Sequence, residues 1–149
     1  MSGIGVGEYL SAMRHEKEAL LPRFEDFWDE IFVKARDARN YQGHIILSDR
    51  PDYFINLDGT GLSILVRKRV VFFKKRILLE MDFYRERKDE EDSILKIYLD
   101  NQGNLYLGHP DEVQPLEFFY EDTASPFFDA LIKSASSGGF ISIDRSAQA

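Results

Sequence analysis

The chain has 149 residues, of which 44% are hydrophobic and 13% are aromatic, enough to build one buried core. This composition excludes an intrinsically disordered chain, and no apolar run is long enough to span a bilayer. The formal charge of -7 opposes attraction to nucleic acid and anionic membranes, and the lack of cysteine excludes disulfides and thiolate metal sites. We therefore expect one globular domain over residues 1–149, with flexible ends at about 1–7 and 145–149. The N-terminus has no secretory signal pattern, which favours a cytoplasmic location.

Residues 8–41 carry apolar side chains at spacings of three and four, which is the helical period. Pro22 lies inside this segment and cannot donate a backbone hydrogen bond to the preceding turn. We therefore expect either a kink at Pro22 or a second helix that starts there, and we favour the kinked helix. The half of the segment that follows Pro22 has the wider apolar face and should anchor the core.

Beyond Gly43 the apolar pattern changes to alternation, which predicts strands. The predicted strands span residues 44–47, 53–57, 62–73, 77–87, 93–99 and 105–107. Short polar turns between them favour antiparallel hairpins, with residues 88–92 as a charged, solvated turn. Residues 66–76 are the least defined, because no glycine marks a turn there, and a bulge or a buried helical turn fits this segment as well.

After the strands, Pro110 and Pro115 bound an irregular acidic stretch. Ser125 followed by Pro126 predicts the N-cap and first residue of a short helix, which Gly138 should end. Residues 140–143 could add an edge strand. The predicted fold is α+β, with a kinked N-terminal helix and a C-terminal helix packed on an antiparallel meander sheet of about five or six strands. A long helix followed by a meander resembles the layout of cystatin-like and NTF2-like domains, which implies a curved sheet able to hold a ligand.

Alternation places the apolar residues of the last three strands at odd positions, so they share one face of the sheet. The opposite face is polar, and Asp82, Tyr98 and Tyr106 are expected to lie roughly in a row on it. The candidate ligand-binding residues on this polar face are Glu80, Asp82, Tyr84, Lys96, Tyr98 and Tyr106. Carboxylates, an amine and phenols side by side suit a polar ligand. They are also ordinary occupants of a solvated sheet face.

No catalytic motif occurs, so we predict no catalytic residue and no cofactor, and we favour a protein that is not an enzyme. His15, His44 and His109 share no helical or strand spacing, so no metal site is predicted. His109 is the best candidate for a general acid or base because it lies in a loop, although a solvated loop histidine fits the sequence better.

Charge is segregated along the chain, and only residues 62–87 have a net positive charge. We interpret the bases of this segment as flanking an apolar strand and pairing with acidic helices, and nucleic-acid binding is disfavoured. The acidic run Asp89, Glu90, Glu91 and Asp92 is the candidate partner-binding surface, or otherwise a solubilising one.

These observations favour a non-catalytic protein-binding module, such as a small bacterial inhibitor, immunity or adaptor-type protein, acting through an acidic and aromatic surface. The expected partner is another protein, which could be basic, and the chain could also form a homo-oligomer. The alternative is a small-ligand-binding or enzymatic domain that uses the polar sheet face.

Overall fold

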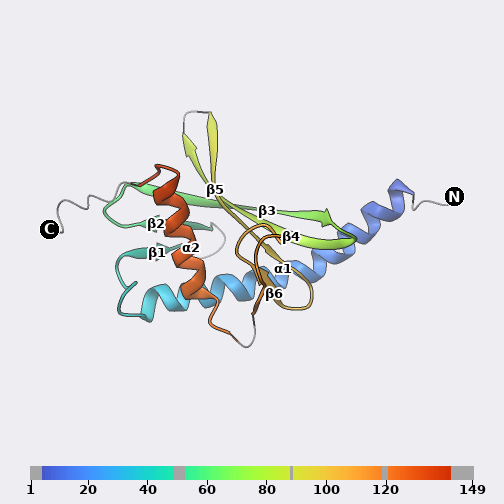
Figure 1. Cartoon of the computed structure of the whole chain (residues 1–149), viewed down its shortest axis with the longest axis horizontal. Helices are drawn as coiled ribbons and strands as arrows, with labels where there is room; N and C mark the ends of the chain where they lie inside the picture. Colours follow the sequence, from blue (N-terminus) through green and yellow to red (C-terminus); the bar gives the residue numbers. More distant parts are fainter. Residues whose placement is uncertain (1–4, 49–52, 88, 119–120, 142–149) are drawn as a thin grey trace.

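The computed structural model describes residues 5–48, 53–87, 89–118 and 121–141. Within these residues two helices and seven strands follow one another in the order α1 (Val6–Asp37), β1 (Ile45–Leu47), β2 (Phe54–Leu57), β3 (Leu62–Phe73), β4 (Arg76–Arg87), β5 (Glu90–Leu99), β6 (Asn104–Tyr106), β7 (Leu116–Glu117) and α2 (Ala124–Ser137). The predicted α+β class is confirmed (Figure 1). The sheet has seven described strands instead of five or six, because β7 follows Pro115, where no strand was predicted.

α1 is one helix of 32 residues that continues through Pro22, so no second helix starts there. Its apolar stripe is buried from Leu20 onwards at Leu20, Phe24, Phe27, Trp28, Ile31 and Ala35. The indole of Trp28 also donates a hydrogen bond to the carbonyl of Ser48, at 3.2 Å. The first turns of α1 project beyond the end of the sheet (Figure 1).

The sheet follows chain order from β1 to β7, and every neighbouring pair of strands is antiparallel. Three aromatic rings connect the two helices to the sheet: Phe127 of α2 lies 5.2 Å from Phe27 of α1 and 5.0 Å from Phe83 of β4, between ring centroids. Both helices therefore pack on the sheet face that carries Phe83. This is the predicted apolar face, on which Leu79, Met81 and Ile97 are fully buried.

β3 and β4 form one long hairpin across the segment that was least defined from sequence. Phe73 pairs with Arg76, so only Lys74 and Lys75 separate the strands. Both lysines have a left-handed φ, of 46° and 63°, which two-residue hairpin loops require and which glycine or asparagine usually supplies. The turn carries no glycine signal, and the bulge and the buried helical turn are both absent from the described residues 66–76.

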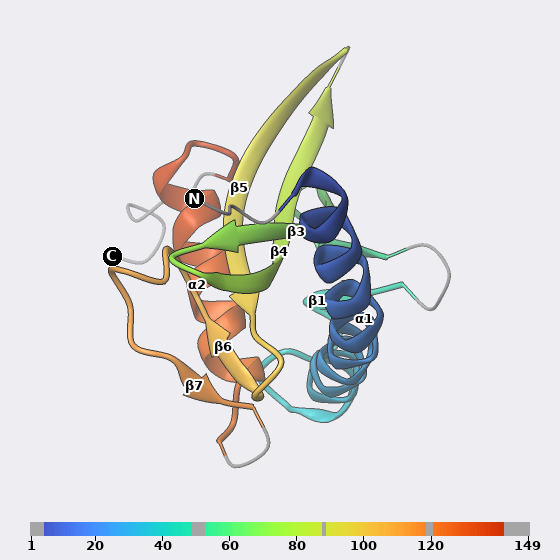
Figure 2. The same ribbon diagram turned by 90° about the vertical axis from the view of Figure 1, so that its right-hand side faces the viewer.

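In the predicted charged turn of residues 88–92, residues 90–92 are strand residues instead, and residue 88 lies outside the described residues. β4 extends to Arg87, which pairs with Glu90 at the start of β5, so only two residues separate these strands. Asp89 has a left-handed φ of 67°, as such a short loop demands. Glu90, Glu91 and Asp92 are therefore strand residues, in a hairpin that projects beyond both helices (Figure 2).

A bulge shifts the register of β4 against β5 by one residue near the middle of the pair. Because of this bulge and the short loop, residues 79–83 of β4 pair with β5 in a register that differs by two residues from the predicted register. Tyr98 lies opposite Glu80, and Asp82 lies opposite Lys96, whereas the predicted pairing of Tyr98 with Tyr106 is confirmed. The predicted row of Asp82, Tyr98 and Tyr106 is therefore wrong, because Glu80 takes the place of Asp82. A shift by two residues leaves the side chains of residues 95–99 on their predicted face, whereas the bulge brings Ser93 to the polar face.

α2 begins one residue before the predicted N-cap Ser125, and Thr123 occupies the N-cap position. The predicted end is confirmed, since Gly138 is the C-cap. Phe140 is not in a strand; its backbone N–H donates to the carbonyl of Ala135. Residues 142–143 of the predicted edge strand, residues 145–149 of the predicted flexible end and residues 1–4 of the leader lie outside the described residues.

Candidate functional site

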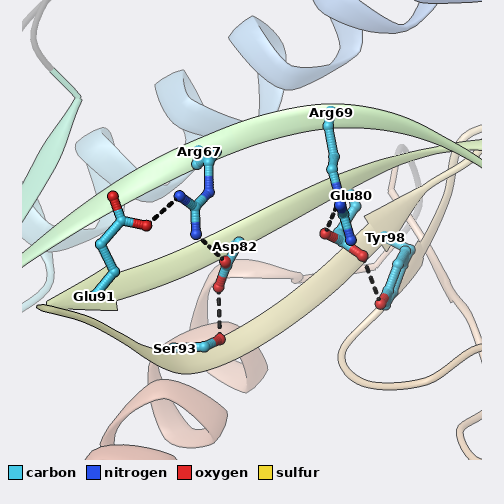
Figure 3. Close-up of polar contacts among 7 residues, drawn as sticks. All are labelled: Arg67, Arg69, Glu80, Asp82, Glu91, Ser93 and Tyr98. Carbon is cyan, nitrogen blue, oxygen red and sulfur yellow. Dashed lines mark hydrogen bonds and ion pairs between the residues drawn. The ribbon is translucent and has the colours of Figure 1, made fainter.

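The polar face of the sheet is not covered by a described helix, yet two of its carboxylates are buried. Glu80 and Asp82 are each only 5% exposed. The cause lies on β3, where Arg67 pairs with Asp82 and Arg69 with Glu80 across the strands. These arginines lie over the carboxylates and cover them, as Figure 3 shows.

Glu80 accepts hydrogen bonds at both oxygens. Arg69 Nε donates to Oε1 at 2.7 Å, and the hydroxyl of Tyr98 donates to Oε2 at 3.0 Å (Figure 3). Burial and this hydrogen bond to Glu80 raise the pKa of Tyr98 to about 12. The hydrogen bond to Glu80 likewise raises the pKa of Arg69 above its ordinary value. Glu80, Arg69 and Tyr98 thus form one hydrogen-bonded cluster that joins β3, β4 and β5.

Asp82 is also bonded at both oxygens. Arg67 Nη2 donates to Oδ2 at 2.9 Å, and Ser93 Oγ donates to Oδ1 at 2.6 Å. The bulge puts Ser93 on this face, because it places Ser93 opposite Tyr84. Arg67 also bonds Glu91 and lies 4.6 Å from the ring centroid of Tyr84. The hydrogen bonds to Asp82 and Glu91 raise the pKa of Arg67.

The remaining candidates of the polar face are cross-strand neighbours of these clusters, since Lys96 lies opposite Asp82 and Tyr106 lies opposite Tyr98. Tyr106 is buried and accepts a hydrogen bond from Arg76 at 2.9 Å, whereas Lys96 is exposed. Sequence reasoning missed Arg67, Arg69 and Arg76 as members of this face. The available signal was the odd positions of Arg67 and Arg69, which alternate with the apolar residues of β3.

The acidic run of the β4–β5 hairpin pairs with arginines in the structure. Glu90 lies 3.1 Å from Arg87 and Asp92 lies 2.9 Å from Arg85, while Glu91 contacts Arg67 of β3. These are contacts of exposed or half-buried side chains, so each contributes little to stability. They do hold the carboxylates in fixed positions along the projecting hairpin.

His109 lies at the surface beside the β3–β4 turn. Its ring lies edge-on to Phe73, with 5.0 Å between ring centroids, and its Nδ1 accepts a hydrogen bond from the backbone of Asp111 at 3.2 Å. A small hollow of about 140 Å³ separates it from Glu80 and Tyr98. Both oxygens of Glu80 already have donors, so the hollow offers no open carboxylate to His109.

A second, larger hollow was not predicted. It has a volume of about 750 Å³ and lies open to solvent between the end of α1 and the start of α2. We call it the acidic groove; its lining residues are Asp29, Glu30, Val33, Lys34, Asp37, Ala38, Asp122 and Ala124. Val33 is 46% exposed within it, so an apolar side chain lies among four carboxylates and one amine.

The start of α2 fixes two of these carboxylates. Asp122 Oδ1 accepts hydrogen bonds from the backbone of Ala124 and Ser125, at 3.1 and 3.3 Å, and Glu30 accepts one from the backbone of Thr123 at 3.4 Å. Burial acts to raise the pKa of Asp122, but the hydrogen bonds to Ser125 and Lys34 together outweigh it and lower that pKa. Asp122 is therefore ionised at neutral pH. Sequence reasoning had singled out none of Asp29, Glu30 and Asp37, the other acidic residues of the groove.

Comparisons with models of protein families, with curated proteins and with solved structures find no match for this chain. The resemblance to cystatin-like and NTF2-like domains thus rests on the order of helix and meander alone. In the described ranges, no helix is long and apolar enough to cross a membrane. The same ranges contain no group of three histidine or carboxylate side chains able to hold a metal ion.

Proposed function

We propose that this protein is a non-catalytic protein-binding module of the inhibitor, immunity or adaptor type, and that its acidic groove takes a basic segment of a partner protein. The observation that carries the proposal is the composition of the groove. Four carboxylates and one amine line a hollow of about 750 Å³ around the exposed side chain of Val33.

The negative charge of the acidic groove favours a partner segment that is positively charged. Its lining carries a net negative charge, and the C-terminal end of α1 adds the partial negative charge of its unpaired carbonyls. Lys34 is engaged with Asp122 at 3.5 Å, and Asp37 with Arg36 at 2.8 Å. A partner segment with lysine or arginine beside an apolar residue matches both the carboxylates and Val33.

The groove is also held in shape before binding. Asp122 and Glu30 are tied to backbone N–H groups at the start of α2, so ordering them costs little when a partner arrives. Arg36 holds Asp37, whose pKa this hydrogen bond lowers. Asp122 and Asp37 are therefore presented to a cationic partner in their ionised forms.

The β4–β5 hairpin provides a second acidic contact. In the sequence, residues 85–92 carry more acidic than basic side chains, with Glu86, Asp89, Glu90, Glu91 and Asp92 against Arg85, Arg87 and Lys88. The hairpin projects beyond the helices (Figure 2), so a partner can reach it without disturbing the core. We infer that the hairpin attracts and orients the approaching partner, because exposed charges affect mainly the rate of association.

The test uses a short peptide of alternating lysine and leucine as a probe and records ¹⁵N–¹H NMR spectra during titration. We expect shifts concentrated at residues 29–38 and 122–124, and an affinity that falls as salt is added. Replacing Asp29→Asn and Asp37→Asn together should weaken binding by about tenfold, if each carboxylate contributes roughly 0.7 kcal/mol.

The matched control removes two carboxylates elsewhere, with Glu18→Gln in the first half of α1 and Asp58→Asn in the β2–β3 turn. Both double variants change the net charge equally. Equal loss of affinity in the two would show attraction to the whole acidic chain and refute the groove. Shifts spread over the polar sheet face would refute it as well.

A further inference from the structure

The N-terminal end of α1 carries an apolar patch that the described residues of one chain leave exposed. The apolar stripe of α1 continues towards the N-terminus at Val6, Tyr9, Leu10 and Met13, at the helical spacings of three and four. Val6 is 76% exposed, Leu10 is 62% exposed and Tyr9 is 39% exposed. These turns project past the strands (Figure 1), so the described sheet ends before it can bury them.

The β3–β4 hairpin borders this patch. The Tyr9 ring packs edge-on against Phe72, with 5.6 Å between ring centroids, and Phe72 is itself 48% exposed. Beside this ring pair lies a hollow of about 520 Å³, lined by Glu8, Tyr9, Ala12, Phe72, Lys75 and Ile77. Four of the six large apolar side chains that are exposed in the described residues thus gather at one end of the molecule, at Val6, Tyr9, Leu10 and Phe72.

We propose that this patch is a homodimer interface in which the N-terminal turns of α1 from two copies pack against each other about a two-fold axis. A two-fold contact uses the same surface on both copies, so that surface must be self-complementary. The patch meets this need because it carries both a ridge, formed by Val6 and Leu10, and an apolar hollow beside Tyr9 and Phe72.

Charge favours a second copy over a strongly charged partner. The only charged residues that line the hollow are Glu8 and Lys75, which have opposite signs. A two-fold contact can set Glu8 of each copy against Lys75 of the other, which makes two ion pairs at the rim. The chain carries a net charge of -7, so two copies repel over most of their surface. This patch has no net charge of its own and lets them approach.

The experiment is sedimentation equilibrium on the full chain over a range of concentrations. The expected result is a mass of twice 17.3 kDa at high concentration and a reversible return to 17.3 kDa on dilution. Replacing Val6→Ser and Leu10→Ser together should raise the dimer dissociation constant by about tenfold or more, because each copy loses two apolar side chains from the contact.

The control is Ile46→Ser on β1, which removes an apolar side chain of 45% exposure away from the patch and should leave the dimer intact. Each variant is checked by circular dichroism for an unchanged fold. A wild-type chain that stays at 17.3 kDa at every concentration overturns the proposal. So does a dimer that Ile46→Ser weakens as much as the double replacement.

Charge reversal tests the arrangement within the dimer. Glu8→Lys or Lys75→Glu alone puts like charges together and should weaken the dimer severalfold, while both reversals in one chain should restore most of the affinity. If the loss of dimerisation free energy in the combined variant equals the sum of the losses in the two single variants, the two-fold pairing of Glu8 with Lys75 is overturned. This outcome is independent of the acidic groove, which lies at the other end of α1.

Discussion

Replacing Arg69→Met should destabilise the fold at neutral pH, because it leaves the carboxylate of Glu80 buried without its cation. Glu80 is 5% exposed and would keep only the hydrogen bond from Tyr98. A hydrogen bond to a charged group contributes about 1.5–3 kcal/mol. The Arg69 side chain is 62% exposed, and solvent screening reduces the expected loss to about 1–2 kcal/mol. Methionine retains the apolar stem, so the change reports on the charge.

The assay is urea unfolding at neutral pH, followed by circular dichroism. Arg87→Met removes a pair that is exposed on both sides and should cost less than about 0.5 kcal/mol. Equal effects of the two replacements would refute the buried-carboxylate account.

Two further predictions concern the β4–β5 turn and the phenol of Tyr98. Asp89→Gly should raise the free energy of unfolding by about 0.5 kcal/mol and Asp89→Val should lower it by about 1–2 kcal/mol, because φ is 67° at this position; equal urea midpoints for the two would contradict that backbone geometry. Tyr98 has a folded pKa of about 12 against an ordinary value of 10.0, so its contribution to stability is complete below pH 10.0 and lost as the pH rises to about 12. Ultraviolet titration should show a step near pH 12 from the phenol of Tyr98, and this step should be absent in Tyr98→Phe. Ionisation of all the phenols near pH 10.0 would contradict the prediction.

The polar face shows which features of the sheet the alternation of apolar and polar residues can predict. The period of two placed Glu80 and Asp82 on the face opposite the apolar rows, and the structure confirms that face. The pattern did not reveal what covers these carboxylates, because Arg67 and Arg69 belong to a strand whose turn carries no glycine. Without that turn, the register of β3 against β4 could not be set, and the bases were assigned to pairing with the helices instead.

The acidic groove lay beyond sequence reasoning for a different reason. Its walls come from the end of α1 and the start of α2, and the contact between Lys34 and Asp122 joins residues 88 apart in the chain. Each carboxylate on its own looks like an ordinary solvated side chain on a helix or loop. Only the packing of Phe127 between Phe27 and Phe83 brings the two helices together and makes one surface of them.

The sequence by itself determined the local periods of this protein, and hence its two helices, the strands β1 to β6 and the choice of buried face. Those features depend on side chains a few residues apart. The hydrophobic effect buries the apolar ones and leaves the polar ones in water, whichever way the elements are arranged in the fold. The tertiary structure decided which strand residues stand opposite one another, which charges neutralise each other and where hollows form. These depend on turn lengths, one bulge and the docking of distant helices, since a single residue more or less in a turn changes every cross-strand partner.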